Sequence, residues 1–239
     1  SVAISQNTDS IISSVKQFVT DYNTMIDSLN SKIYETKYSD YEPLTKSQEA
    51  SMTTTQIEQW NTKAKSGLLY HSQVLRNLVS DMREAIYTPV DSITSKYNSA
   101  SAIGITSSTD QGHLTLDEDK LKTALAADPS FVYEIFSSSQ DTATTGDKVA
   151  AASDYANTGI ANRLYSVVNE GVSNIKTYAG TSSETDDSST LGTLIRNLKT
   201  KMSDFKTQMD AYEDVLYKKY DAMETAISTL SSQLSTITG

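Results

Sequence analysis

The sequence predicts a mainly α-helical protein: an α+β body with a small β-hairpin, and long coiled-coil-type helices near the N-terminus and at the C-terminus. Three observations support this prediction. Only three prolines and nine glycines occur in 239 residues, so long helices are permitted over most of the chain. Apolar residues recur at heptad spacing in two long segments. Two short runs near the middle alternate apolar and polar residues on either side of a turn.

The first long helix follows a short alternating segment. Val2–Gln6 alternates apolar and polar residues, and we interpret residues 1–8 as the end of an upstream inserted domain. Asn7 or Thr8 can then cap a helix. Its apolar positions are spaced 4-3-4-3-4, at Ile11, Val15, Phe18, Tyr22, Met25 and Leu29. Pro43 closes this region, because proline disfavours the α conformation at the residue before it.

Shorter helices follow in the predicted body, residues 9–190. Thr45 begins a small helical turn, and Thr55 with Glu58 has the spacing of a capping box. Gly67 is expected to end the helix before it, because glycine readily adopts the left-handed backbone conformation found there. Ser72 caps the next helix, which ends before Pro89. Its apolar positions are Val74, Leu75, Leu78, Val79, Met82 and Ile86.

The middle of the chain predicts a hairpin and one more short helix. Ala102–Thr106 and His113–Leu116 are the expected strands, with Ser107–Gly112 as the turn. Asp117 and the two acidic residues after it open a helix that runs through Ala127, because acidic side chains favour a helix N-terminus.

Two segments rich in small polar residues predict mobile loops, residues 137–158 and 179–190. An amphipathic helix lies between them. Its apolar positions are Ile160, Leu164, Val167, Val168, Val172 and Ile175.

Residues 191–239 predict a long coiled-coil stem. Its spacings repeat as 4-3, with one extra step of four between Leu216 and Tyr220. This stutter locally unwinds a left-handed supercoil. A helix of this length is roughly 70 Å long, so its stripe needs a partner from another segment or another chain. The predicted helix–helix contact residues are Ile195, Leu198, Met202, Phe205, Met209, Tyr212, Leu216, Tyr220, Met223, Ile227, Leu230 and Leu234, and Ile237 continues the pattern.

Composition excludes several classes of function. The net charge of −10 leaves no basic stripe for phosphates, so nucleic acid is not an expected partner. Cysteine is absent, which removes disulfides and thiolate sites. No run of about 20 apolar residues predicts a membrane span, and no signal-peptide pattern opens the chain. The first residue is Ser1, which suggests a piece of a longer protein.

Candidate chemistry is sparse, and we predict no catalytic, cofactor-binding or metal site. His71 and His113 are the only histidines and lack a shared metal-ligand spacing. The acidic residues that begin at Asp117 fit a helix cap better than a calcium loop. Trp60 is expected in the core, since large aromatic residues usually anchor an interior. The sequence therefore predicts a structural assembly protein and not an enzyme.

Three blocks of residues resemble the C-terminal region of the flagellar hook-associated protein 2 family, the FliD filament-capping proteins. The first block comprises Phe18-Val19, Tyr22-Asn23, Tyr41-Glu42-Pro43-Leu44-Thr45, Gln48, Met52, Ile57, Trp60 and Ala64-Lys65-Ser66-Gly67-Leu68-Leu69. The second comprises Ile103-Gly104-Ile105-Thr106, Gly112, Leu114-Thr115-Leu116-Asp117, Leu121, Ala124-Leu125, Pro129 and Phe136. The third comprises Glu213, Leu216-Tyr217, Tyr220, Ala222-Met223-Glu224 and Gln233. One departure is His71-Ser72, where the family pattern has an acidic residue.

The resemblance implies a structural cap at the distal, extracellular end of the flagellar filament, which promotes flagellin assembly and is needed for motility. Leu191–Ile237 would be the stem and Phe18–Phe136 the body of the cap plate. The implied partners are further copies of the chain, flagellin and neighbouring axial proteins, and an export chaperone on the C-terminal helix. Export without a cleaved signal peptide is also implied. The alternative from another class is a surface adhesin that binds host glycans or mucin through its Ser/Thr-rich loops.

Overall fold

The computed structural model describes residues 8–108, 111–128, 130–138, 155–181 and 187–238. It divides into two compact units, Ser1–Asn174 and Ile175–Gly239, and each is described by itself. The mainly α-helical fold class with one small antiparallel hairpin is confirmed. The predicted strand at Val2–Gln6 lies outside the described residues. The same holds for residues 139–154 of the first predicted loop and residues 182–186 of the second.

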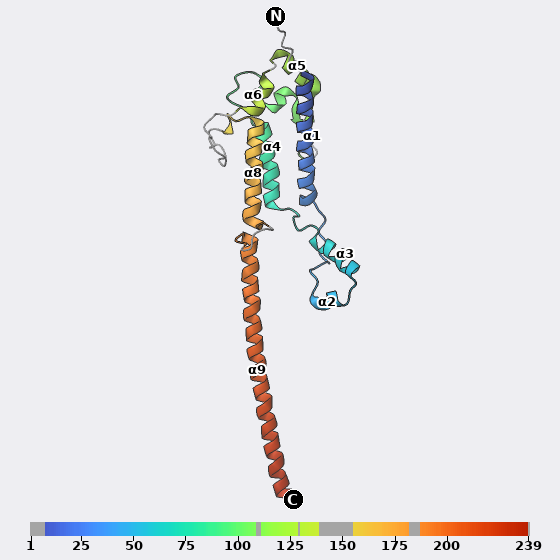
Figure 1. Ribbon diagram of the computed structural model, residues 1–239, viewed down its shortest axis with the longest axis vertical. Coiled ribbons are helices and arrows are strands. Elements are labelled where there is room, and N and C mark those ends of the chain that lie inside the picture. The colour runs from blue at the N-terminus through green and yellow to red at the C-terminus, as the bar shows by residue number, and fades with distance from the viewer. Residues whose placement is uncertain (1–7, 109–110, 129, 139–154, 182–186, 239) are drawn as a thin grey trace. The chain divides into compact units, whose positions relative to one another are not determined.

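The core of the first unit is built on α1 (Thr8–Ile33) and α4 (Gln73–Tyr87). Helix α4 lies between α1 and the first part of α8 (Ile160–Ala179) (Figure 1). The 3-10 helix η1 (Ala100–Ile103), the hairpin and α5 (Glu118–Ala127) pack against α1 or α4. The residues that are fully covered include Ile26, Met82, Ile86, Val90, Ile103, Ile105, Leu121, Phe131, Ile135 and Ile160.

The buried face of α1 is wider than the predicted heptad stripe. Val15 and Tyr22 are buried as expected, but Phe18 and Met25 are only partly covered. The buried set also contains Ile12, Val19, Ile26 and Asn30, each one position after a stripe residue, and Ile33 at the end of the helix. A heptad stripe assumes a single partner helix. Helix α1 instead meets α4, α5 and strand β2 together, which covers a broader face.

Helices α2 (Lys46–Ala50) and α3 (Thr54–Lys65) form a small arm, and both begin with a capping box. Thr45 caps α2 as predicted: its side chain accepts a hydrogen bond from the Gln48 backbone N–H, and the Gln48 side chain accepts one from the Thr45 backbone N–H. The prediction for α3 was wrong by two residues, since Thr53 and Gln56 form the box. Both threonines fit the sequence pattern, but Thr53 has the extended backbone that an N-cap requires (φ −76°, ψ 158°).

Gly67 turns the chain back from the arm to the body. Its φ is +70°, the left-handed region that the sequence predicted. A Cβ at this position would lie 2.6 Å from the Cα of Lys37, so only glycine fits without a shift of backbone. The Glu35 carboxylate accepts a hydrogen bond from the Gly67 N–H at 3.0 Å, which ties the turn to the end of α1.

The hairpin is shorter than predicted. Strands β1 (Ile105–Ser107) and β2 (Leu114–Leu116) pair antiparallel, with Ile105 opposite Leu116. Residues 102 and 103 belong instead to η1, which Gly104 ends at φ +90°. The short strand run could not distinguish a 3-10 turn from the first residues of a strand.

Asparagines of α1 hold the hairpin. The Asn23 side-chain amide donates to the Leu114 carbonyl at 2.9 Å and its oxygen accepts from the Leu114 N–H at 2.7 Å. Two turns further on, Asn30 donates to the Gln111 carbonyl at 3.0 Å. These bonds fix the register of β2 along α1.

The ends of α5 and α4 lie close to the positions that the sequence predicted. Asp117 caps α5 by accepting from the Lys120 N–H at 3.0 Å, which confirms its role as a cap. Ser72 occupies the N-cap position of α4 without a side-chain bond, and α4 ends two residues before Pro89. Helix α6 (Phe131–Ser137) was not predicted.

Among the described residues, Arg163 is the largest fully buried side chain, with 1% of its surface exposed, and sequence analysis missed it. Its guanidinium donates to backbone carbonyls of Thr88 and Pro89 at the end of α4, and to those of Tyr155 and Ala156 before α8. Burial lowers the pKa of the Arg163 guanidinium from its ordinary value. The side chain joins two chain segments by saturating carbonyls that a helix end leaves free.

Candidate interaction surfaces

The second unit contains α9 (Thr190–Thr238), a helix of 49 residues. The Ser189 hydroxyl accepts a hydrogen bond from the Gly192 N–H at 3.0 Å, which satisfies one free amide of the first turn. Asp187 accepts from the Ser189 N–H at 2.9 Å. Hydrogen bonds from Ser189 hold the pKa of the Asp187 carboxyl below its ordinary value of 3.8. No Pro or Gly follows Gly192 within the helix, so the ladder continues to its end.

The predicted apolar stripe of α9 is uncovered in the part of the chain that the structure describes. Eleven of the twelve predicted contact residues expose between 51% and 73% of their surface. Ile195 and Leu198 have the lowest exposure of these eleven, and Met202 has the highest. Leu216 is half-buried. Ile237 continues the stripe at 82% exposure. Exposed apolar area of this extent is typical of an interaction surface, and helix–helix contact remains our prediction for it.

The stutter keeps the stripe on one side of a straight helix. A strict heptad pattern drifts by about 20° per repeat around a straight α-helix. Leu198 and Leu234 lie 36 positions apart, which is about ten turns at 3.6 residues per turn. The extra step at Leu216–Tyr220 thus cancels the accumulated drift. The surface suits a straight partner better than a tightly supercoiled one.

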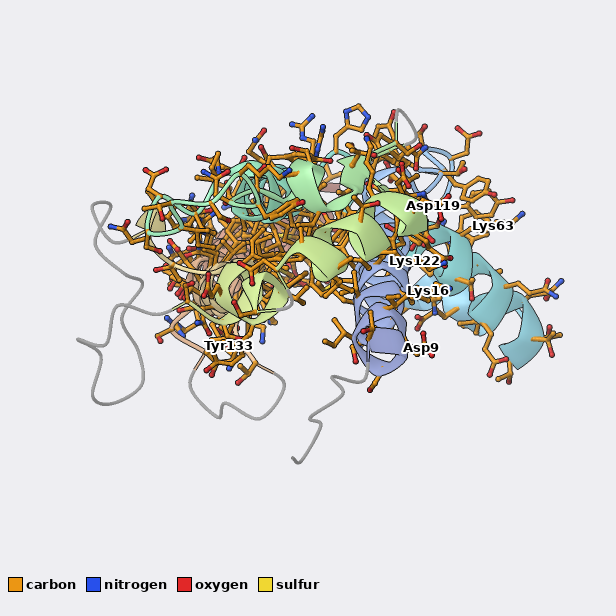
Figure 2. The ribbon with its side chains drawn as sticks, turned by 90° about the horizontal axis from the view of Figure 1, so that it is seen from above. Asp9, Lys16, Lys63, Asp119, Lys122 and Tyr133 are labelled. Carbon is orange, nitrogen blue, oxygen red and sulfur yellow. The ribbon has the colours of Figure 1, made fainter. Side chains whose placement is uncertain are left out.

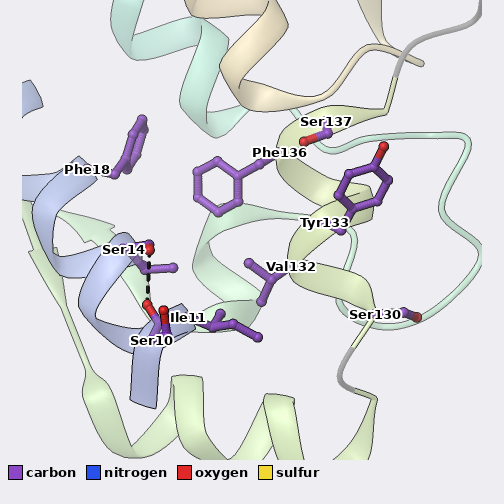
Figure 3. Close-up of a pocket in the computed structure, with 10 residues that line it drawn as sticks. Ser10, Ile11, Ser14, Phe18, Ser130, Val132, Tyr133, Phe136 and Ser137 are labelled. Atoms are coloured by element: carbon purple, nitrogen blue, oxygen red, sulfur yellow. Dashed lines mark hydrogen bonds between the residues drawn. The ribbon is translucent and has the colours of Figure 1, made fainter. Parts of the chain in front are cut away.

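The body carries a second apolar surface, a groove of about 600 Å³ between α1 and α6. Figure 3 shows Phe18 and Phe136 next to each other among its lining residues, and their rings make an edge-to-face contact with centroids 5.0 Å apart at 78°. Ile11 and Val132 line its floor, and Tyr133 at its rim is 75% exposed. Two partly covered residues of the α1 stripe, Ile11 and Phe18, therefore line this groove.

The arm carries an aromatic cluster. Trp60 lies 4.7 Å from Tyr41 between ring centroids and donates its indole N–H to the Glu42 carbonyl at 2.7 Å. The Lys63 ammonium lies 4.6 Å from the centre of the Tyr41 ring. The prediction that Trp60 belongs to the core was wrong, because Trp60 is only half-buried and packs within the arm. Residue type indicated burial but could not show which elements would cover the ring.

Charged groups sit at the surface and join elements of the body. Lys16 of α1 forms an ion pair with Glu118 of α5 at 2.8 Å, and Figure 2 labels Lys16 on α1 and Lys122 on α5. His113 pairs with Asp27 at 2.7 Å. His71 adopts a left-handed backbone (φ 53°) and stacks on Tyr70. Within the described residues, no group of three or more acidic or histidine side chains has the geometry to hold a metal ion.

The chain combines a helical body with a long helix whose apolar stripe is uncovered in the described residues. These features are typical of structural proteins that assemble through helix–helix contacts. None of the described helices has the combination of length and hydropathy that a membrane span requires. Residues 1–232 match the family model described as the C-terminus of flagellar hook-associated protein 2. The chain belongs to this family of structural flagellar proteins, and the resemblance seen in the sequence is confirmed.

Two similar proteins support the assignment to this family. The chain is 31% identical to flagellar hook-associated protein 2 of Halalkalibacterium halodurans over 98% of its own length and 46% of that protein. It is 28% identical to the protein of the same name from Thermotoga maritima, over 99% of its length and 34% of that protein. The chain thus spans less than half the length of these relatives. The adhesin alternative gains no support from their names.

One solved structure is similar. The crystal structure of the flagellar cap protein FliD from Escherichia coli matches with 24% sequence identity and a TM-score of 0.42. The match covers 73% of this chain and 34% of that one.

Proposed function

We propose that the chain is part of the structural cap at the distal end of the bacterial flagellar filament, where it joins other subunits through α9. The observation that carries the proposal is the uncovered apolar stripe of α9 in a member of the flagellar hook-associated protein 2 family. The body has its own core. The stem, by contrast, has no covering in the described residues.

The energetics favour assembly through the stripe. Each large apolar side chain releases about 1.5–3 kcal/mol when it is fully removed from water. The twelve stripe residues are mostly more than half exposed, so even partial burial along the helix offsets the loss of freedom on association. The stripe therefore supplies the favourable free energy for contacts between subunits.

The proposed partners are further copies of the chain, flagellin and neighbouring axial proteins. Before export, a chaperone would cover the stripe of α9, since an exposed stripe of this length promotes unwanted association. The protein would reach the filament tip without a cleaved signal peptide. At the tip the cap would promote insertion of flagellin, which is needed for motility.

Gene replacement tests the proposal. Deletion of the gene that encodes the chain should release flagellin into the medium and abolish swimming, and the wild-type gene should restore both. A Met209→Asp variant should fail to restore them, because Met209 lies in the stripe. Thr207→Asp is the matched control, since Thr207 lies on the opposite face of the same turn. Normal filaments and swimming in the deletion strain would contradict the cap function.

A further inference from the structure

The arm contains a pocket of about 450 Å³. Its apolar wall consists of Tyr41, which precedes α2, Met52, which follows α2, and Trp60 of α3. The Tyr41 and Trp60 rings are tilted by 56° to each other. All three side chains are half-buried, and none of them belongs to the core of the body. The apolar wall is therefore open to a ligand and is not needed to build that core.

Hydrogen bonds within the arm hold the two rings in place. The Trp60 indole N–H donates to the Glu42 carbonyl at 2.7 Å. The Lys63 ammonium donates to the Tyr41 hydroxyl at 3.0 Å. A capping box fixes the first turn of α3, which carries part of the wall. A pocket whose side chains are already ordered loses less conformational freedom when a ligand binds.

The charge of the pocket is positive. Among the residues that line it, Lys63 is the only charged one. Its ammonium lies 4.6 Å from the centre of the Tyr41 ring, and no carboxylate of the described residues lies within ion-pair distance of it. The hydrogen bond with the Tyr41 hydroxyl raises the pKa of Lys63, so the group is charged at neutral pH. Acidic side chains outnumber basic ones by 30 to 20 in the chain, yet none lines this pocket.

We propose that the arm pocket binds an acidic peptide segment of another protein, with a carboxylate on Lys63 and a neighbouring apolar side chain against Met52 and Trp60. An ammonium has three donors, and Tyr41 takes one of them, which leaves two for the carboxylate. The Gln56 side-chain oxygen accepts from the Thr53 N–H, so its amide N–H groups remain at the rim as donors to peptide carbonyls.

The same lining favours an acidic peptide over a neutral sugar. A sugar would stack on the rings but leave the Lys63 ammonium without a counter-charge. No carboxylate lines the pocket to accept hydrogen bonds from sugar hydroxyls. The pocket lies in the arm and not on the stripe of α9, so this inference does not depend on the proposed function.

Tryptophan fluorescence tests the proposal, because Trp60 is the single tryptophan of the chain and forms part of the pocket wall. Two tripeptides with blocked ends serve as probes, leucine-aspartate-leucine and leucine-asparagine-leucine, which differ only in the charge of the central side chain. The aspartate peptide should give a saturable change and bind at least about threefold more tightly than the asparagine peptide. High salt should remove this preference, because screening weakens an exposed ion pair.

Three variants of the whole chain separate the charge from the apolar wall. Lys63→Gln should bind the two peptides equally, to within about 1.5-fold. Lys65→Gln is the matched control on the same helix, outside the pocket, and should keep the parent's preference. Met52→Ala should weaken both peptides alike and leave their ratio unchanged. Circular dichroism should show equal helix content in all three variants.

Several results would overturn the inference. The aspartate peptide would give no saturable change, Lys63→Gln would keep the preference, or Lys65→Gln would lose it. Tighter binding of N-acetylglucosamine than of the aspartate peptide would make the pocket a sugar site instead. Sedimentation equilibrium should give the same mass for Lys63→Gln and the parent. A lower mass for the variant would mean that the pocket holds a segment of a second copy and not of another protein.

Discussion

Helices α1 and α9 carry apolar residues at the same heptad spacing but have opposite environments. Tyr22 of α1 is 3% exposed, whereas Tyr212 of α9 is 66% exposed. Helix α1 meets α4, α5 and β2 within the body, and α9 has no comparable neighbour in the described chain. Heptad spacing thus predicts a helix with a contact face, but it does not say whether the same chain provides the partner. The body is stabilised by its own core, and we propose that the stripe of α9 contacts other molecules.

The largest expected difference between body and stem is the loss of unfolding free energy when an arginine is replaced. Arg163→Met should lower the free energy of unfolding by about 3–5 kcal/mol, because carbonyls at the end of α4 lose their donor inside the body. Urea unfolding followed by fluorescence of the single tryptophan, Trp60, measures this change. Arg196→Met on α9 is the control and should cost less than about 0.5 kcal/mol. Equal effects would mean that body and stem unfold as one unit.

A pair of methionines sharpens the same comparison. Met82 is fully buried, and Met202 on the stripe is 73% exposed. Met82→Ala should destabilise the body by about 2–5 kcal/mol, through lost apolar burial and the cavity that remains. Met202→Ala should leave unfolding within about 0.5 kcal/mol of the parent. A large effect of Met202→Ala on unfolding would show that the stripe is covered within one chain.

Shortening the stem should have a small effect on the body. A chain that ends at Met209 keeps every residue of the core. Calorimetry should show a cooperative transition within about 4 °C of the parent, which corresponds to about 1–2 kcal/mol for a chain of this size. If the shortened chain has no cooperative transition, the body depends on the distal stem and the division into two regions is wrong.

The smallest expected effect concerns pH. The pKa of Glu35 lies below its ordinary value of 4.5, first because its carboxylate accepts the Gly67 N–H and second because it bonds Lys32. A lowered folded-state pKa stabilises the body above pH 4.5, and this contribution is lost as the pH falls through the folded-state value. Glu35→Gln should therefore lower the melting temperature slightly at pH 7 and converge with the parent in acid. A constant difference from pH 7 down to pH 3 would contradict this cause.

The sequence predicted those features that depend on a few neighbouring residues. The stripe of α9, the left-handed Gly67 and the Asp117 cap each depend on a few neighbouring residues. Tertiary contacts decided the rest. Nothing near Arg163 in the sequence marks it as buried, because its acceptors lie in two segments, one of them more than 70 residues away. The prediction for Trp60 was wrong because its ring packs on Tyr41, which precedes α2, and not on the core of the body.

The interaction surfaces show the same limit. The sequence predicted the stripe residues of α9 but could not show that the described chain leaves them exposed. The groove between α1 and α6 was not predicted, since α6 itself was missed. A surface between elements far apart in the chain has no periodic signal that a sequence pattern could reveal.

The central claim is that the apolar stripe of α9 joins separate molecules while the body folds alone. Light scattering of the Ile227→Asp, Leu230→Asp double variant beside the parent tests it most directly. Two carboxylates in an apolar seam cost several kcal/mol unless the helices separate. The double variant should therefore show a lower mass than the parent at equal concentration, with the melting of its body unchanged. A parent that is monomeric at high concentration, or a variant that keeps the parent's mass, would contradict the claim.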